Sequence, residues 1–463
     1  MNDSLEFLSV YGDQIVNQSG QTIILKGVGI GGWMNMENFV IGFPANEEAF
    51  RISILEVLGE QLYEIFFDEY LHNFFQSEDA EFIRALGFNS IRIPINYRHF
   101  EDDMAPFEIK EGGFQHLDRI IRLCVQHKIY AIIDLHALPG YQNQDWHSDN
   151  PTHKALFWTH KHFQDRVVNL WQAIADRYKG NPWVAGYNLI NEPADPSGKV
   201  IIPFYERIMN AVRVIDPDHI IFLDGNRYSL DFDMFGEPYQ NVVYAVHDYA
   251  WPGFIDGGPY PGITRGEFFD KDRLEATFVA RCDYMFTHKV PIWVGEFGPV
   301  YTGDRRLDQE RIVLLQDQLD IYTKYRVNWS LWTYKDIGLQ GIVMVKPDST
   351  WMKKTNSVLR LKDELGADAW GGIEEKVGEV ICPLESIFNQ KFSNYKPFPF
   401  DTRWQINRLV RHILLSEPIL EQTKIVLGDL DMDEIQALMA SFRFEDCLPR
   451  TELCEVLHQN LHS

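Results

Sequence analysis

The sequence predicts an α/β protein, a closed (β/α)₈ TIM barrel with an N-terminal hairpin and a C-terminal helical appendage. Eight short apolar segments recur before residue 335 of the 463-residue chain, and helical or loop segments separate them. Strands that are continuously apolar are typical of a parallel sheet that helices cover. Eight strand–helix repeats over this length favour a closed barrel, with a doubly wound open sheet as the alternative.

The eight predicted strands are rich in β-branched and aliphatic residues. In chain order they are residues 22–28, 89–95, 129–136, 184–192, 219–225, 242–249, 291–297 and 328–334. Helices are expected between them, as over residues 114–128, where apolar side chains recur at i, i+3, i+4 and i+7. Residues 157–180 and 307–325 show the same amphipathic pattern.

Two further segments are predicted to extend the barrel. Residues 8–23 have the pattern of a hairpin, which we expect to close the bottom of the barrel. Residues 36–80 form a long insertion after the first strand, rich in Phe, Glu and Asn. It lies where the top-face loops of such a barrel lie.

The pattern changes near residue 366, and this change divides the chain into a barrel domain, 1–365, and a helical appendage, 366–463. Asp401 is expected to cap a helix of the appendage. The apolar stripe of that helix comprises Ile406, Leu409, Val410 and Ile413. The acidic run DLDMDE lacks the glycine and the glutamate of a calcium loop, so no metal site is expected.

Composition excludes several kinds of partner. The chain carries 43 basic and 67 acidic residues, a net charge of −24, which repels nucleic acid and anionic membranes. Its five cysteines include no C-x-x-C pair, which favours free thiols in a reducing compartment. No signal-peptide pattern is visible and no apolar run approaches the ~18 residues of a membrane span, so the expected location is cytoplasmic. The oligomeric state is not predicted.

Two predicted strands end in glutamates that are candidates for catalysis. Glu192 ends the fourth strand, within NLINEPADP, and Glu296 ends the seventh, within WVGEFGP. Strands four and seven lie across a barrel from each other, so both carboxylates can point into one central cleft at its C-terminal rim. Paired carboxylates at such a rim are the equipment of glycoside hydrolysis. The alternative interpretation is a pair of capping or salt-bridged glutamates.

The motifs around these glutamates resemble glycoside hydrolase family 5, the cellulase-type (β/α)₈ family. The matching motifs occur in the order that the family shows and are NEP, GEFG, IRIP, DLH, HDY and WSLW. The resemblance covers residues from about 10 to 360 and does not include residues 366–463. It implies that Glu192 is the general acid/base and Glu296 the nucleophile of a retaining reaction.

The resemblance also implies roles for six neighbouring residues. Two of them, Arg92 and Tyr249, would lie against Glu296 and keep it ionised, and Arg92 would lower its pKa. The acid would then have the higher pKa of the two glutamates. Asn191 would bind the sugar 2-hydroxyl. His136 and His247 would orient the site, and Trp332 would stack on the sugar.

The stretch TIILKGVGIGGW contains the spacing G-x-G-x-x-G, at Gly27, Gly29 and Gly32, which also opens dinucleotide-binding units. The residues that follow are a poor helix start, and no acidic residue falls at a strand end about 20 positions on. The stretch instead resembles the first-strand motif of the exo-1,3-β-glucanase branch of family 5, in which a glutamate matching Glu37 holds the terminal sugar. DLHALPGYQNQDW resembles that branch too and adds Asn143 as a candidate contact.

This chain departs from the branch pattern at three positions. Gly29 stands where Asn is usual, Ala137 where Gly is usual, and Tyr334 where Trp is frequent. These departures weaken an assignment to β-1,3-glucan.

The predicted function is a retaining glycosidase, exo-acting on small β-glycosides, with a carbohydrate as its partner and no cofactor. The insertion at 36–80 is expected to block one end of the cleft, and the lack of a secretion signal argues against insoluble polysaccharide. The alternatives are an endo-β-glucanase or furanosidase of the same family and a non-catalytic carbohydrate-binding barrel. The hypothesis of a dinucleotide-dependent oxidoreductase rests on the three glycines alone.

Overall fold

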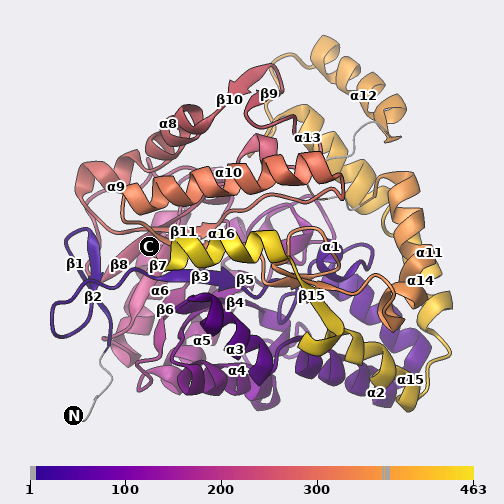
Figure 1. The fold of residues 1–463 in the computed structure, drawn as a ribbon, viewed down its shortest axis with the longest axis horizontal. Coiled ribbons are helices and arrows are strands. Elements are labelled where there is room, and N and C mark those ends of the chain that lie inside the picture. Colours follow the sequence, from indigo (N-terminus) through magenta and orange to yellow (C-terminus); the bar gives the residue numbers. More distant parts are fainter. Residues whose placement is uncertain (1–6, 368–369, 371–375, 463) are drawn as a thin grey trace.

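A computed structural model describes residues 7–367, 370 and 376–462. Eight parallel strands close a barrel, as predicted (Figure 1). In order around the barrel they are β3 (Lys26–Gly29), β4 (Ser90–Asn96), β5 (Tyr130–Ala137), β6 (Val184–Asn188), β7 (Ile220–Asp224), β8 (Val242–His247), β11 (Ile292–Glu296) and β12 (Asn328–Leu331). Pairing of Trp329 with Lys26 joins the last strand to the first.

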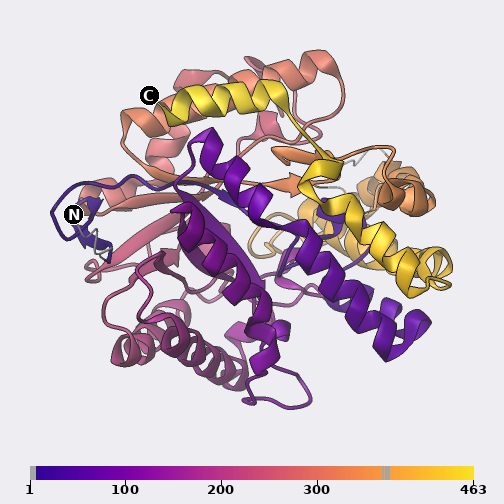
Figure 2. The ribbon, with the colours of Figure 1, turned by 60° about the horizontal axis from the view of Figure 1, so that its bottom comes forward.

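Helices follow the strands and cover the outside of the barrel (Figures 1 and 2). They are α3 (Ser77–Leu86), α4 (Phe114–His127), α5 (Lys161–Tyr178), α6 (Ile201–Ile215), α7 (Asn226–Ser229), α8 (Lys271–Arg281), α9 (Asp283–His288), α10 (Arg305–Lys324) and α11 (Thr350–Leu365). The three helices predicted from amphipathic spacing are α4, α5 and α10. The strands are buried on both faces, which explains why they read as unbroken apolar runs.

The N-terminal hairpin consists of β1 (Ser9–Tyr11) and β2 (Gln14–Val16). Leu8 and Ile15 pack in one buried cluster with Leu25, Ile132 and Trp293. This cluster fills the end of the barrel at which the strands begin, so the hairpin closes the bottom as predicted.

The insertion after β3 folds into two helices, α1 (Asn38–Ile41) and α2 (Glu47–Phe74). Gly59 interrupts α2 with a φ of 72°, a conformation that residues with a side chain rarely adopt. The first part of the insertion borders the mouth of the barrel, and the long helix extends to its side (Figure 2).

The described part of the C-terminal segment 366–463 is mainly helical. Its elements are α12 (Gly378–Lys391), α13 (Thr402–Asn407), a π-helical stretch (Arg408–Leu414), α14 (Ile419–Leu427), α15 (Met432–Met439), β15 (Cys447–Pro449) and α16 (Thr451–Leu461). Asp401 caps α13 by accepting a hydrogen bond from the Trp404 backbone, as predicted.

This C-terminal segment packs against the rest of the chain. β15 pairs with β14 (Val343–Val345), which in turn pairs with β13 (Lys335–Asp336). Helices α14 and α15 lie along α2, and α16 lies against α10 and α3 (Figures 1 and 2). The division of the chain at 365/366 remains a prediction.

The remaining strands, β9 (Gly262–Thr264) and β10 (Glu267–Phe269), form a hairpin in the segment between β8 and α8. All five cysteines have free thiols. None of the helices in the described residues combines the length and the apolar character needed to cross a membrane. The cytoplasmic location stays a prediction.

Candidate active site

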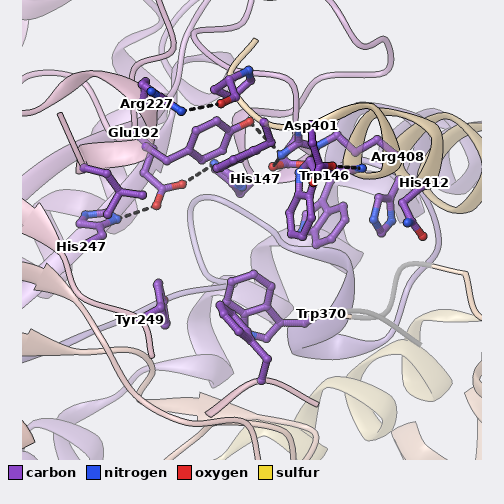
Figure 3. A pocket seen from close by; sticks show the side chains of 18 of the residues that line it. Trp146, His147, Glu192, Arg227, His247, Tyr249, Trp370, Asp401, Arg408 and His412 are labelled. Atoms are coloured by element: carbon purple, nitrogen blue, oxygen red, sulfur yellow. Dashed lines mark hydrogen bonds and ion pairs between the residues drawn. The ribbon is translucent and has the colours of Figure 1, made fainter. Parts of the chain in front are cut away.

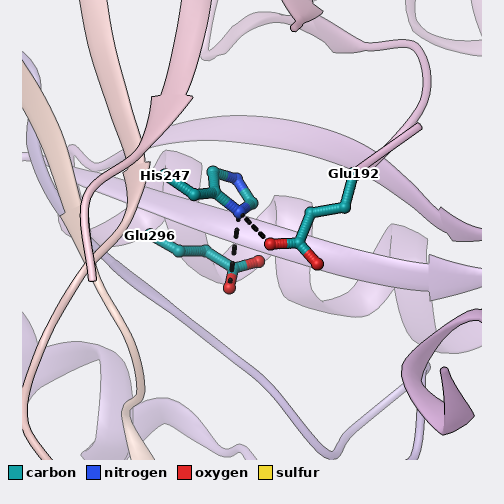
Figure 4. Close-up of side chains that lie close together, drawn as sticks. All are labelled: Glu192, His247 and Glu296. Carbon is teal, nitrogen blue, oxygen red and sulfur yellow. Dashed lines mark hydrogen bonds and ion pairs between the residues drawn. The ribbon is translucent and has the colours of Figure 1, made fainter. Parts of the chain in front are cut away.

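Glu192 and Glu296 lie on opposite sides of the barrel mouth and face each other. Glu296 is the last residue of β11, and Glu192 lies four residues beyond the end of β6 with a φ of 46°. One oxygen of each carboxylate and one ring nitrogen of His247 all lie within 4.8 Å of one another (Figure 4). This short separation is that of a retaining pair, because an inverting pair must leave room for a water. Three such groups this close together could also bind a metal ion. Their hydrogen bonds and ion pairs within the chain explain why they lie so close.

Glu296 is held by two donors. Arg92 Nη1 binds Oε1, and the Tyr249 hydroxyl donates to Oε2 at 2.9 Å. Arg92 is itself fully buried and also pairs with Asp134 at 3.1 Å and donates to Asn191 Oδ1 at 2.6 Å. The carboxylate is therefore fixed in one orientation, as a nucleophile requires.

The pKa of Glu296 differs in part from the sequence expectation. The charge of Arg92 lowers this pKa, as expected, but burial of the carboxyl group has the larger effect and raises it. The sequence cannot reveal how dry a strand end becomes, so the expected net depression is wrong. Burial raises the pKa of Glu192 well above its ordinary value, and the negative charges of Asp224 and Asp145 add to the rise. Glu192 thus has the stronger tendency to remain protonated.

Two histidines hold the Glu192 carboxyl group. Nδ1 of His247 lies 2.7 Å from Oε1, and Nε2 of His147 lies 2.9 Å from Oε2 (Figure 3). Burial lowers the pKa of both rings. His247 also lies 3.7 Å from Glu296, so it touches both carboxylates. His147 was not among the predicted site residues, because it follows the DLH motif in a loop with no periodic pattern.

His136 and Trp332 form one wall of the pocket beside the carboxylates. Their rings stack with centroids 5.5 Å apart and planes inclined by 8°. His136 Nδ1 lies 2.7 Å from Asp134, and its Nε2 lies 3.2 Å from the amide nitrogen of Asn191. Asn191 is fully buried behind this wall, where Arg92 and His136 fix it.

The glycine-rich exit of β3 makes room for Trp332. A Cβ on Gly29 would lie 2.8 Å from the indole ring, and a Cβ on Gly32, whose φ is 77°, would lie 2.3 Å from the Val40 side chain. A helix of the dinucleotide-binding type does not follow, since the next helix is the four-residue α1. The spacing G-x-G-x-x-G here serves close packing at the pocket floor.

Glu37 lies at the start of α1 and lines the pocket. Its side chain makes no capping hydrogen bond, and its buried Oε1 has no hydrogen-bond partner. His136 Nε2 is 4.0 Å away. Burial, and then the negative charges of Glu296 and Glu192, raise its pKa well above the ordinary value. A buried acceptor without a partner is costly, which indicates that a ligand supplies the missing donor.

Asn143, the remaining predicted contact, is fully buried and does not line the pocket. Its amide nitrogen donates to the backbone carbonyl of Glu192 at 3.0 Å and lies 2.8 Å from His147. The structure therefore places Asn143 behind Glu192, where it supports Glu192 and His147.

The family follows from comparison with known sequences. The sequence model of the family described as Cellulase (glycosyl hydrolase family 5) matches residues 60–338. The chain belongs to glycoside hydrolase family 5. It is accordingly a glycosidase, and the retaining mechanism of this family agrees with the carboxylate separation.

Relatives extend the comparison over the whole chain. The protein named Beta-xylosidase from Phanerodontia chrysosporium is 43% identical and covers 98% of this chain and 98% of its own. Probable glucan 1,3-beta-glucosidase A from Aspergillus clavatus is 28% identical over 50% of this chain and 56% of its own. Among solved structures, rutinosidase from Aspergillus niger has a TM-score of 0.54 at 18% identity and covers 69% of this chain and 93% of that one, which supports the fold.

The pocket of this family 5 enzyme extends well beyond Glu192 and Glu296. Its volume is ≈ 990 Å³, and much of its wall comes from the C-terminal segment, outside the family match (Figure 3). Residues of the wall that the sequence did not predict include Asp145, Trp146, Tyr228, Trp370, Trp404 and Arg408. Aromatic residues are common core material, so no sequence signal separates those that line a pocket from those that fill a core.

Proposed function

We propose that this chain is an exo-acting retaining β-glycosidase that releases single sugar units from the non-reducing end of small β-glycosides. The observation that carries the proposal is Glu37. Its unpaired, buried carboxyl oxygen lies in the pocket beside His136, where the outer hydroxyls of a terminal sugar have no further sugar unit to cover them. A chain that continued past this sugar would instead need an open groove here.

In the proposed reaction, Glu296 attacks the anomeric carbon while Glu192 donates its proton to the glycosidic oxygen. The bond from the anomeric carbon to the leaving group breaks, and a glycosyl–Glu296 ester forms. Glu192, now ionised, takes a proton from water, which attacks the anomeric carbon and releases Glu296. Arg92 and Tyr249 stabilise Glu296 as an anion whenever it is free.

The hydrogen bonds of Glu192 suit a group that changes its protonation state twice per turnover. His247 and His147 each contact one oxygen of the carboxyl group. Because burial lowers the pKa of both rings, the histidines stay neutral and do not force Glu192 into the charged form.

The substrate sugar is best sought among β-xylosides and β-glucosides. The relative that covers nearly the whole chain is named for xylosidase activity, and shorter matches are named for 1,3-β-glucosidase activity. The departures at Gly29, Ala137 and Tyr334 favour xylosides over 1,3-glucan as the first substrate to test.

A panel of 4-nitrophenyl glycosides tests the proposal. We expect β-xyloside or β-glucoside to be cleaved, with retention of anomeric configuration by proton NMR. A time course on xylotetraose and laminaritetraose should release only monosaccharide and the trimer at first. Early dimer from internal cleavage would overturn the exo assignment, and inversion would overturn the roles of Glu192 and Glu296.

A further inference from the structure

The C-terminal segment supplies a second wall of the pocket, connected to Glu192 through Tyr228 and His147. We call Phe400, Trp404 and Arg408, together with Tyr228 from α7, the aromatic wall. All four line the pocket. Phe400 packs on Tyr228 and on Trp404 with ring centroids 5.2 Å apart in each case.

Arg408 holds the aromatic wall together. Its guanidinium group is buried, makes a two-pronged ion pair with Asp145 and donates to the Tyr228 hydroxyl at 3.2 Å. The carbon of the same group lies 5.5, 5.4 and 5.2 Å from the ring centroids of Tyr228, Phe400 and Trp404. A planar cation among three rings is a rigid arrangement, so the wall is preformed.

A continuous set of contacts leads from this wall to Glu192. The Tyr228 ring lies 5.9 Å from the ring of His147, whose Nε2 is 2.9 Å from Glu192. In a retaining reaction the acid protonates the oxygen of the leaving group, so the leaving group lies on the acid's side of the sugar. The aromatic wall is thus on the side of the pocket where a leaving group protonated by Glu192 would lie.

Several polar groups at this wall are already paired within the chain, while the indole nitrogen of Trp404 is buried without a partner. Arg408 is bound to Asp145, Asp401 caps α13, and one nitrogen of Arg227 donates to the Pro399 carbonyl at 3.1 Å (Figure 3). A second sugar needs partners for several hydroxyls, whereas the wall's unpaired side-chain donor among the described residues is the one indole N–H of Trp404, which a single acceptor atom of an aglycone can satisfy. Ring faces and the neighbouring prolines remain for a ligand.

We propose that the aromatic wall is a leaving-group subsite for a flat, apolar aglycone of the aryl type, and that the C-terminal segment thereby determines substrate choice. This inference rests on the proposed glycosidase function and on Glu192 as its acid. A pocket of ≈ 990 Å³ is at the upper end of the range for drug-sized ligands, so a monosaccharide leaves ample space for an aryl group.

The test compares Phe400→Ala and Trp404→Ala with the unchanged enzyme on three substrates, each in the xylose and glucose series. These are the 4-nitrophenyl β-glycoside, the β-linked disaccharide and the β-glycosyl fluoride. Fluoride departs without an aglycone and without help from an acid. We expect each variant to lose about tenfold or more in kcat/KM on the nitrophenyl glycoside, from lost ring contact, and to keep its activity on the fluoride.

Two further variants separate ring contact from folding. Trp404→Phe keeps a ring and should retain most of the activity on the nitrophenyl glycoside. Phe392→Ala removes the same side chain as Phe400→Ala from the same segment, at a position that is 55% exposed and outside the pocket, and should match the unchanged enzyme on all three substrates.

Three results would overturn the proposal. Equal losses on nitrophenyl glycoside and fluoride would give the wall a structural role only. A larger loss on the disaccharide than on the nitrophenyl glycoside would make it a sugar subsite. No turnover of either fluoride by the unchanged enzyme would refute the assignment to β-xylosides and β-glucosides proposed above, and the subsite with it, whereas the first two results leave that assignment intact.

Discussion

Replacement of Glu37 by alanine is the most direct test of how the terminal sugar is recognised. The carboxyl group is buried, and its Oε1 has no partner within the chain. Its pKa is raised well above the ordinary value, by burial first and then by Glu296 and Glu192, so the neutral acid persists over a wide pH range. Glu37 can therefore both donate to and accept from a sugar hydroxyl.

The magnitude follows from the cost of an unsatisfied buried polar group. In Glu37→Ala a sugar hydroxyl in the closed pocket loses its partner, at a cost of about 1–3 kcal/mol. We expect kcat/KM on a monosaccharide 4-nitrophenyl glycoside to fall roughly ten- to a hundredfold, with the fold intact. Glu37→Gln preserves size and hydrogen bonding of the neutral acid, so its loss should be several-fold smaller.

The control is Glu60→Ala, which removes an exposed carboxylate from α2 and should leave kcat/KM unchanged. Melting temperatures of all variants show whether a loss reflects unfolding. Activity of Glu37→Ala near that of the unchanged enzyme, combined with internal cleavage of oligosaccharides, would refute the terminal-sugar role. The chemistry assigned to Glu192 and Glu296 would stand.

Three other predictions concern the catalytic pair and the C-terminal segment. Glu296→Ala should abolish turnover. Azide should restore cleavage with inverted product, because a small anion can enter the space left by the nucleophile. Full activity without azide would exclude Glu296 as the nucleophile. In the unchanged enzyme kcat/KM should fall as pH drops through the pKa of Glu296 and as pH rises through the higher pKa of Glu192, and Glu192→Gln should lose that alkaline fall on the 4-nitrophenyl glycosides; an unaltered alkaline fall would exclude Glu192 as the acid. Deletion of residues 366–463 should lower the melting temperature or cause aggregation. The deletion leaves β14 without its partner strand β15 and leaves buried Lys335 without the Phe442 carbonyl that it binds. An unchanged melting temperature would show that the segment is independent.

The barrel could be predicted because its strands carry a strong local signal. Burial on both faces forces unbroken apolar runs, and each predicted run contains or overlaps one strand of the closed sheet. The ends of the strands were harder to place. The predicted fourth strand ran to Glu192, whereas β6 ends at Asn188 and the chain then turns, with Glu192 at a positive φ. That turn, which directs the carboxyl group toward His247, has no counterpart in sequence periodicity.

Among the supporting residues of the site, the contacts of those on or next to strands could be predicted from the sequence, and the contacts of those in loops could not. Arg92 lies within β4, His247 ends β8 and Tyr249 lies just beyond it, and all three contact the carboxylates of Glu192 or Glu296 as expected. Asn143 and His147 are in an irregular loop, and their positions relative to Glu192 depend on how that loop folds. The loop in turn is tied down by the ion pair of Asp145 with Arg408, 263 residues later in the chain. Such long-range pairs leave no trace in a local pattern.

The apolar stripe of the C-terminal segment shows why its role escaped the sequence. Ile406 and Val410 are buried, but they pack with Val377 and Ile381 at the start of α12, within the segment itself. The face that reaches the pocket is instead the one carrying Arg408. An amphipathic pattern identifies the apolar face of a helix and treats the other face as solvated. Here the apolar face only assembles the segment, and the polar and aromatic face borders the pocket beside the acid. A family that is recognised by its barrel alone can therefore differ in substrate through residues that its motifs do not include.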